Sequence, residues 1–157
     1  MLGLRGKRVA QAVGTALLAP ALVVAMTSAA HADSDTHWVH KKSDHCLYPV
    51  YDNNGHPTDV TLRTGCSDRD TDWHDVNNGD GTWLERSKYD PGYCLVAYTD
   101  HDAYMEPCNG NDYQRWEEIN TGHGWNLKNK ATHECLDSNG DRVYMLACNG
   151  GDYQLWL

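Results

Sequence analysis

Residues 135–156 read Cys-Leu-Asp-Ser-Asn-Gly-Asp-Arg-Val-Tyr-Met-Leu-Ala-Cys-Asn-Gly-Gly-Asp-Tyr-Gln-Leu-Trp, and the chain contains this pattern more than once. Residues 94–116 repeat its outline closely, and residues 46–73 carry a weaker copy. The markers are Trp38, Cys46, Cys66 and Trp73, then Trp83, Cys94, Cys108 and Trp116, then Trp125, Cys135, Cys148 and Trp156. Self-similarity of about forty residues indicates a repeat architecture. The sequence therefore predicts three repeats, approximately 38–76, 77–119 and 120–157.

Between these markers, short runs alternate apolar and polar residues, as at 60–62, 125–127 and 143–145. A period of two is typical of half-buried strands, and turns rich in Asn and Gly separate the runs. One repeat has room for about four strands, which is too few to bury a core alone. We therefore expect an all-β domain in which the three repeats together close a barrel.

The repeated tryptophans and leucines are the predicted core of that barrel. The closing tryptophans supply large apolar area, and the leucine after each first cysteine packs beside them. The glutamines of the two Gln-x-Trp motifs are expected to bond main-chain groups. These residues are Trp73, Trp116 and Trp156, with Leu47, Leu95 and Leu136, and with Gln114 and Gln154.

The first thirty-two residues have the features of a secretory signal peptide. Basic Arg5, Lys7 and Arg8 precede an apolar run from Ala16 to Met26, and residues 30–32 (Ala-His-Ala) offer a cleavage site. The run is too short for a membrane span and contains Pro20, so we predict no membrane insertion. Residues 33–157 are then expected to form the secreted, extracellular domain.

All six cysteines lie after this leader, two per repeat. An oxidising compartment favours disulfides, and the repeat selects one of the possible pairings. The predicted bonds are Cys46–Cys66, Cys94–Cys108 and Cys135–Cys148. The formal net charge is −9, and the leader contains three bases and no acid. An acidic domain without clustered Lys and Arg argues against nucleic acid as a partner.

The Cys-Leu-Asp, Cys-Asn-Gly and Gln-x-Trp pattern resembles the ricin B-type β-trefoil, a fold of lectins and carbohydrate-binding modules. The resemblance covers Trp38 to Leu157. It implies non-catalytic sugar binding in shallow pockets, with a carboxylate two positions after the first cysteine. Asp137 stands there in the third repeat, whereas Val96 and Tyr48 replace it in the second and first repeats.

Other sugar-binding positions depart from the family pattern. Leu146, Glu106 and Thr64 stand where the resemblance implies a stacking aromatic residue. Tyrosines instead cluster near the expected sites, and they could form a sugar platform, dock a protein partner or fill the hairpin cap. The candidate carbohydrate- or partner-binding residues are Asp137, Asn139, Tyr144 and Tyr153 in the third repeat, with Tyr98, Tyr104 and Tyr113 in the second.

Metal and catalytic motifs are weaker. We expect His37, His40 and His45 to be solvated, because they lie near the start of the mature domain. The acidic runs 68–72 and 75–81 do not match the calcium-loop pattern. No nucleophile elbow or zinc-protease motif occurs, and adjacent strand residues Glu117 and Glu118 face opposite ways. The sequence therefore predicts no metal, no cofactor and no catalytic residue.

Two functions remain open. The first is a secreted non-catalytic module that recognises cell-surface or polymeric carbohydrate. The second is a protein-docking subunit of a larger secreted assembly, such as a multi-subunit bacterial toxin. In that case residues 33–44 could add as a strand to a partner's sheet.

Overall fold

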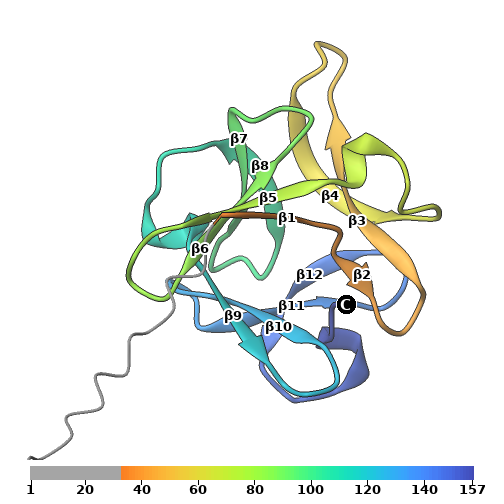
Figure 1. The fold of residues 1–157 in the computed structure, drawn as a ribbon, viewed down its shortest axis with the longest axis vertical. Helices are drawn as coiled ribbons and strands as arrows, with labels where there is room; N and C mark the ends of the chain where they lie inside the picture. The colour runs from red at the N-terminus through yellow and green to blue at the C-terminus, as the bar shows by residue number, and fades with distance from the viewer. Residues whose placement is uncertain (1–32) are drawn as a thin grey trace, which may run out of the picture.

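The computed structural model describes residues 33–157, so the predicted signal peptide lies outside the described residues. These residues form short strands joined by tight turns, which confirms the all-β prediction (Figure 1). Among them, no helix has the length and apolar character that crossing a membrane requires. The strands are β1 (Ser34–Thr36), β2 (Val39–His40), β3 (His45–Tyr51), β4 (Pro57–Arg63), β5 (Trp73–Asn77), β6 (Trp83–Ser87), β7 (Tyr93–Ala97), β8 (Ala103–Pro107), β9 (Trp116–Asn120), β10 (Trp125–Asn129), β11 (Glu134–Ser138) and β12 (Val143–Ala147). Single 3₁₀ turns are η1 (Arg69–Thr71), η2 (Asp112–Gln114) and η3 (Asp152–Gln154).

The same strand pairing recurs in each repeat. Strands β3–β4, β7–β8 and β11–β12 form antiparallel hairpins, which occupy three separate lobes in Figure 1. Strands β5–β6 and β9–β10 pair across the junctions between repeats. Trp156 closes the third junction by bridging both Trp125 and His40. The chain therefore returns to its start, and one core serves all three repeats.

The three closing tryptophans lie at the centre of that core, as predicted. Each is fully buried. Each indole Nε1 donates to the carbonyl of the leucine that follows the first cysteine of the same repeat. The distances are 3.1 Å from Trp73 to Leu47, 3.0 Å from Trp116 to Leu95 and 3.1 Å from Trp156 to Leu136. The repeated motif thus builds one interaction three times, because a buried indole N–H needs an acceptor.

The glutamines of the Gln-x-Trp motifs hold the turns that precede the tryptophans. Gln114 Oε1 accepts from the Asn109 amide at 2.7 Å, and its Nε2 donates to the Pro107 carbonyl at 3.0 Å. Gln154 makes the equivalent bonds to Asn149 and Ala147, at 2.8 and 3.1 Å. Both glutamines are fully buried. The expected main-chain role of these residues is confirmed.

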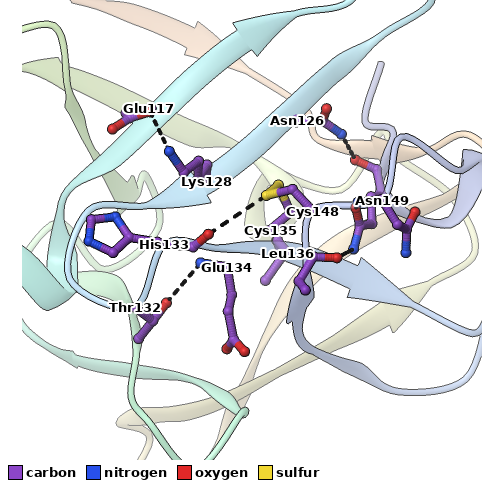
Figure 2. The surroundings of a disulfide bond; sticks show 12 residues. Glu117, Asn126, Lys128, Thr132, His133, Glu134, Cys135, Leu136, Cys148 and Asn149 are labelled. Carbon is purple, nitrogen blue, oxygen red and sulfur yellow. Dashed lines mark hydrogen bonds and ion pairs between the residues drawn. A yellow bond between two sulfur atoms is a disulfide. The ribbon is translucent and has the colours of Figure 1, made fainter.

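All three predicted disulfides are present: Cys46–Cys66, Cys94–Cys108 and Cys135–Cys148. Each fastens the first strand of a hairpin to the segment that leaves its second strand. Figure 2 shows the third bond, where Cys135 lies on β11 and Cys148 directly follows β12. The disulfides close sequence separations of 20, 14 and 13 residues.

The expectation of solvated histidines near the start of the domain is wrong for His40, whereas His37 is exposed as expected. Strand β1 pairs antiparallel with β5, with Ser34 opposite Asp75 and Thr36 opposite Trp73. His40 is fully buried rather than solvated, and its ring nitrogens lie 2.8 Å from Ser43 Oγ and 3.1 Å from the Tyr153 carbonyl oxygen. The pairing of β1 with β5 and the contact of His40 with Tyr153 join residues far apart in the sequence, so local composition could not reveal them. The segment is part of the domain, and one edge of β1 is already paired with β5.

Candidate functional site

The third repeat contains a small cavity of about 300 Å³ lined by residues of the β11–β12 hairpin and of the segment that follows it. Asp137 and Tyr144 lie directly opposite each other on these strands. Asn139 follows β11, and Tyr153 comes from η3. The fold therefore brings together all four residues that the sequence selected in this repeat. The complete lining is Asp137, Asn139, Tyr144, Leu146, Asn149 and Tyr153.

Asp137 forms the floor of this cavity. Its side chain is only 2% exposed, and Oδ1 is buried without a hydrogen-bond partner among the described residues. Burial, the negative charge of Asp137 and a hydrogen bond to it together raise the pKa of the Tyr144 hydroxyl. Tyr144 therefore remains a neutral donor beside the carboxylate. An unsatisfied buried acceptor is costly, which makes Asp137 a strong attachment point for a ligand hydroxyl.

The rim of the cavity is aromatic and apolar. Tyr153 is 46% exposed, and Lys42 Nζ lies 5.7 Å from the centre of its ring. Leu146 is 44% exposed and occupies the position where the sequence lacks a stacking aromatic residue. Because buried Gln154 anchors the turn that carries Tyr153, this ring has a fixed base. A carboxylate floor beneath aromatic and amide groups suits a ligand with both hydroxyls and an apolar face.

The three tyrosines selected in the second repeat also come together, but in a different arrangement. The ring of Tyr98 lies 6.4 Å from that of Tyr104 and 5.0 Å from that of Tyr113. Two hydroxyls already donate to carboxylates, Tyr98 to Glu106 and Tyr104 to Asp100, each at 2.8 Å. These bonds are the main reason that the pKa of Tyr98 is raised and that of Tyr104 rises to about 12.

The floor of this second-repeat cluster differs too. Buried Val96 pairs with Tyr104, just as Asp137 pairs with Tyr144. A valine cannot accept a hydrogen bond. The cluster of Tyr98, Tyr104 and Tyr113 is therefore an aromatic surface without the carboxylate floor of the third repeat.

A larger neighbouring cavity of about 510 Å³ was not anticipated from the sequence. It shares Asn139, Tyr144 and Leu146 with the first cavity and extends to the second repeat. There, His101 Nδ1 lies 2.8 Å from Glu134 Oε1. The two residues are 33 positions apart, so only the packing of β8 against the third repeat could reveal the pair.

A second unanticipated cluster consists of the carboxyl groups of Asp75 and Glu85, which are buried, and of Glu118, which is half-buried. Burial raises the pKa of all three, well above the usual range for Glu85 and to about 7 for Glu118. The sequence did contain a signal for them. Counting by two from Trp73 and Trp116 places Asp75 and Glu118 on the inner face of their strands.

Comparison with known proteins places these features in a family. The model of the ricin-type beta-trefoil lectin domain matches residues 35–156. Comparison with curated protein sequences finds no match.

Several solved structures share the fold. A designed threefold-symmetric protein, ThreeFoil, is 21% identical with a TM-score of 0.69, covering 78% of this chain and 95% of its own. SeviL bound to asialo-GM1 saccharide is 16% identical, with a TM-score of 0.62 and coverages of 78% and 94%. A mosquitocidal holotoxin is 15% identical, with a TM-score of 0.69; the match covers 80% of this chain but 17% of the holotoxin. At such identities the likeness establishes the β-trefoil fold, and the family match extends almost throughout the described residues. The chain belongs to the ricin-type β-trefoil lectin domain family.

Proposed function

We propose that this protein is a secreted, non-catalytic module that binds carbohydrate in the Asp137 cavity of the third repeat. The observation that carries the proposal is the buried Asp137 carboxylate, with one unpartnered oxygen, in the cavity that Tyr144 and Tyr153 also line. Membership of a lectin-domain family supports the same ligand class. The saccharide in the SeviL structure is a ligand of that protein, and it provides precedent for sugar binding on this fold.

The chemistry of the cavity matches a pyranose. Asp137 can accept hydrogen bonds from neighbouring sugar hydroxyls, with one of them replacing the Tyr144 hydroxyl as its partner. The Tyr153 ring and Leu146 offer an apolar surface to the C–H face of the sugar. Asn139 Oδ1 already accepts from the Asp141 and Arg142 amides, at 3.0 and 2.9 Å, so its turn is held in place before binding.

The Asp137→Asn variant is expected to lose sugar affinity by about tenfold or more, because charge-assisted hydrogen bonds contribute about 1.5–3 kcal/mol each. A glycan array would identify a ligand for the wild-type protein, and isothermal titration would measure its affinity for both proteins. Asparagine preserves the size of the side chain, so thermal unfolding should show that the fold survives. Unchanged affinity in the variant, or a wild-type protein that binds no glycan, would contradict the proposal.

The second repeat supplies a matched control. Tyr113 and Tyr153 occupy the same place in their 3₁₀ turns. We expect Tyr153→Ala to weaken sugar binding about tenfold, in the range of aromatic contributions at recognition sites, whereas Tyr113→Ala leaves it within twofold. The reverse pattern would assign binding to the second repeat.

Secretion is part of the proposal. Three disulfides fit an oxidising compartment. Residues 1–32 have the order of basic and apolar residues that a secretory signal peptide requires. Amino-terminal sequencing of protein recovered from culture medium is expected to begin at Asp33. A secreted protein that retained residues 1–32 would contradict the cleavage prediction.

Protein docking is the second candidate, and the Tyr98 cluster favours it. Its clustered aromatic rings lack a carboxylate floor, and tyrosine is enriched at protein interfaces. The fold also occurs within the mosquitocidal holotoxin. Two results together would support docking in a larger assembly instead. The protein would bind no glycan on the array, and it would capture a stoichiometric partner from the secreted proteins that the Tyr98→Ala variant fails to bind.

A further inference from the structure

We propose that Asp75, Glu85 and Glu118 bind a hard divalent cation of the calcium class. The three acids come from three strands, β5, β6 and β9. One carboxylate oxygen from each lies within 4.8 Å of the other two. Small side-chain adjustments would bring three oxygens so arranged to one cation at about the 2.3–2.6 Å of calcium–oxygen bonds. None of the three residues belongs to the Asp137 cavity.

Each acid also has a buried oxygen that accepts no hydrogen bond from a donor group outside the cluster. The acids hydrogen-bond one another instead, Asp75 with Glu85 and Glu85 with Glu118. Glu85 is fully buried, and its Oε2 accepts from the Trp38 indole at 2.7 Å while Oε1 has no partner outside the cluster. Asp75 is 3% exposed; Oδ2 accepts from Ser34 Oγ at 3.2 Å, and Oδ1 has no partner outside the cluster. Oε1 of Glu118 is likewise buried and has no partner outside the cluster. Buried acceptors in this state are rare and call for a ligand.

The protein supplies no cation of its own at this point. Within residues 33–157, the ion pairs of the structure include none of these three carboxylates. By contrast, Glu117, the neighbour of Glu118 on β9, faces the other way and lies 3.3 Å from Lys128 Nζ. Removing adjacent carboxylates from water without a counter-charge is strongly unfavourable.

The internal symmetry shows that the fold does not require an acid at position 85. Asp75 pairs with Glu85 across β5–β6, and Glu118 pairs with Leu127 across β9–β10. Leu127 therefore occupies the place of Glu85 in the third repeat, and it is fully buried in the core. An apolar residue therefore fits this position. Glu85 serves the Trp38 indole through Oε2, and its Oε1 remains to bind a cation.

The donor set defines the class of cation. It consists of carboxylate oxygens, which favour hard ions such as calcium over zinc or copper, whose sites use nitrogen and sulfur. Glu118 is only partly buried, so the cluster has a side toward solvent. Strand β1 crosses β5 beside the cluster and brings Ser34 to Asp75. Figure 1 shows β1 running alongside β5 near β6.

The proposal can be tested by thermal unfolding of the protein in EDTA and in millimolar Ca²⁺. Calcium is expected to raise the Tm of the wild-type protein by about 5 °C or more, because a ligand that binds only the folded state stabilises it. Glu85→Leu copies Leu127 and should abolish this response. Glu85→Gln preserves the side-chain shape and should weaken the rise in Tm that calcium causes. This variant still tests the proposal if Glu85→Leu impairs folding.

Two measurements localise the cation. Tb³⁺ should show luminescence sensitised by Trp38 and displaced by Ca²⁺, and isothermal titration should give one Ca²⁺ per chain. Glu118→Gln should lower Ca²⁺ affinity about tenfold or more, whereas Glu117→Gln, on the opposite face of the same strand, should leave it unchanged. Equal calcium responses in wild type and Glu85→Leu would overturn the proposal. So would the absence of any response at 10 mM Ca²⁺, which would indicate that shared protons alone occupy the cluster.

Discussion

Replacing Trp116 with alanine is expected to remove most of the stability of the domain. The buried indole fills the centre of the core, and a large-to-small change there costs about 3–5 kcal/mol. The same change removes the N–H that the Leu95 carbonyl accepts, which adds about 1–3 kcal/mol if that oxygen remains dry. Domains of this size have about 5–15 kcal/mol in total. Urea titration followed by circular dichroism should therefore show partial or complete unfolding without denaturant.

Ile119→Ala is the matched control for this prediction. Ile119 lies on β9 with Trp116, but its side chain is 41% exposed. Its truncation should cost less than about 1 kcal/mol, since exposed positions contribute little. If Trp116→Ala were no more destabilised than Ile119→Ala, the central role assigned to the closing tryptophans would be wrong.

The second large effect is expected on removing the disulfide of the third repeat. The double variant Cys135→Ala, Cys148→Ala should lose about 3 kcal/mol of unfolding free energy, because a cross-link of this loop size restricts the unfolded chain. The separation it closes is 13 residues. Chemical denaturation of the wild-type and double-variant proteins would measure the difference.

The disulfide of the first repeat provides the comparison. Cys46–Cys66 closes a longer separation of 20 residues, so its removal should cost slightly more in the same model. Both double variants should still fold at room temperature if the tryptophan core dominates stability. A loss below about 1 kcal/mol in both would show that the bonds contribute little beyond the core.

The fold was predictable because its determinants recur in the sequence. Trp116 and Trp156 lie at matching places, and each bonds the carbonyl of a leucine that also recurs. A feature present in several copies can be recognised even where the sequence of one copy has diverged, as in the first repeat. The cysteine pairing followed for the same reason, since each pair lies within one repeat.

The candidate sites were less predictable because they depend on what differs between repeats. Asp137, Tyr144 and Tyr153 were selected and do line one cavity. For Tyr98 and Tyr104 the sequence could not show that their hydroxyls bond acids, because those contacts depend on side-chain direction. Only strand register and burial showed that the acids at 75, 85 and 118 converge.

Residues 33–44, at the start of the described domain, illustrate a further limit of sequence-based prediction. The Ser, Asp, His and Lys residues of this segment have the composition of a solvated tail, yet Ser34 bonds Asp75 and His40 is buried. Ser34 with Asp75, and His40 with the Tyr153 carbonyl, are contacts between distant parts of the chain. Tertiary pairing, rather than local composition, therefore decides the structure of this segment. Closing the barrel requires this segment, since the Val39 carbonyl accepts from the Leu157 amide at 2.8 Å.

The divergence between repeats also limits the number of sugar sites. All three keep the indole-to-carbonyl bond, whereas the third alone has a carboxylate two positions after its first cysteine. The residues that build the fold are therefore present in all three repeats, whereas the carboxylate proposed to bind sugar is present in one. Because Val96 cannot accept a sugar hydroxyl, the account predicts one pocket of this type per chain.

A crystal structure of the protein with the glycan that binds most strongly on the array would show which repeat holds the sugar. We predict one sugar ring per chain in the third repeat, with its hydroxyls hydrogen-bonded to the Asp137 carboxylate and its apolar face against Tyr153. A sugar seated on Tyr98 and Tyr113, with the Asp137 cavity empty, would contradict the assignment.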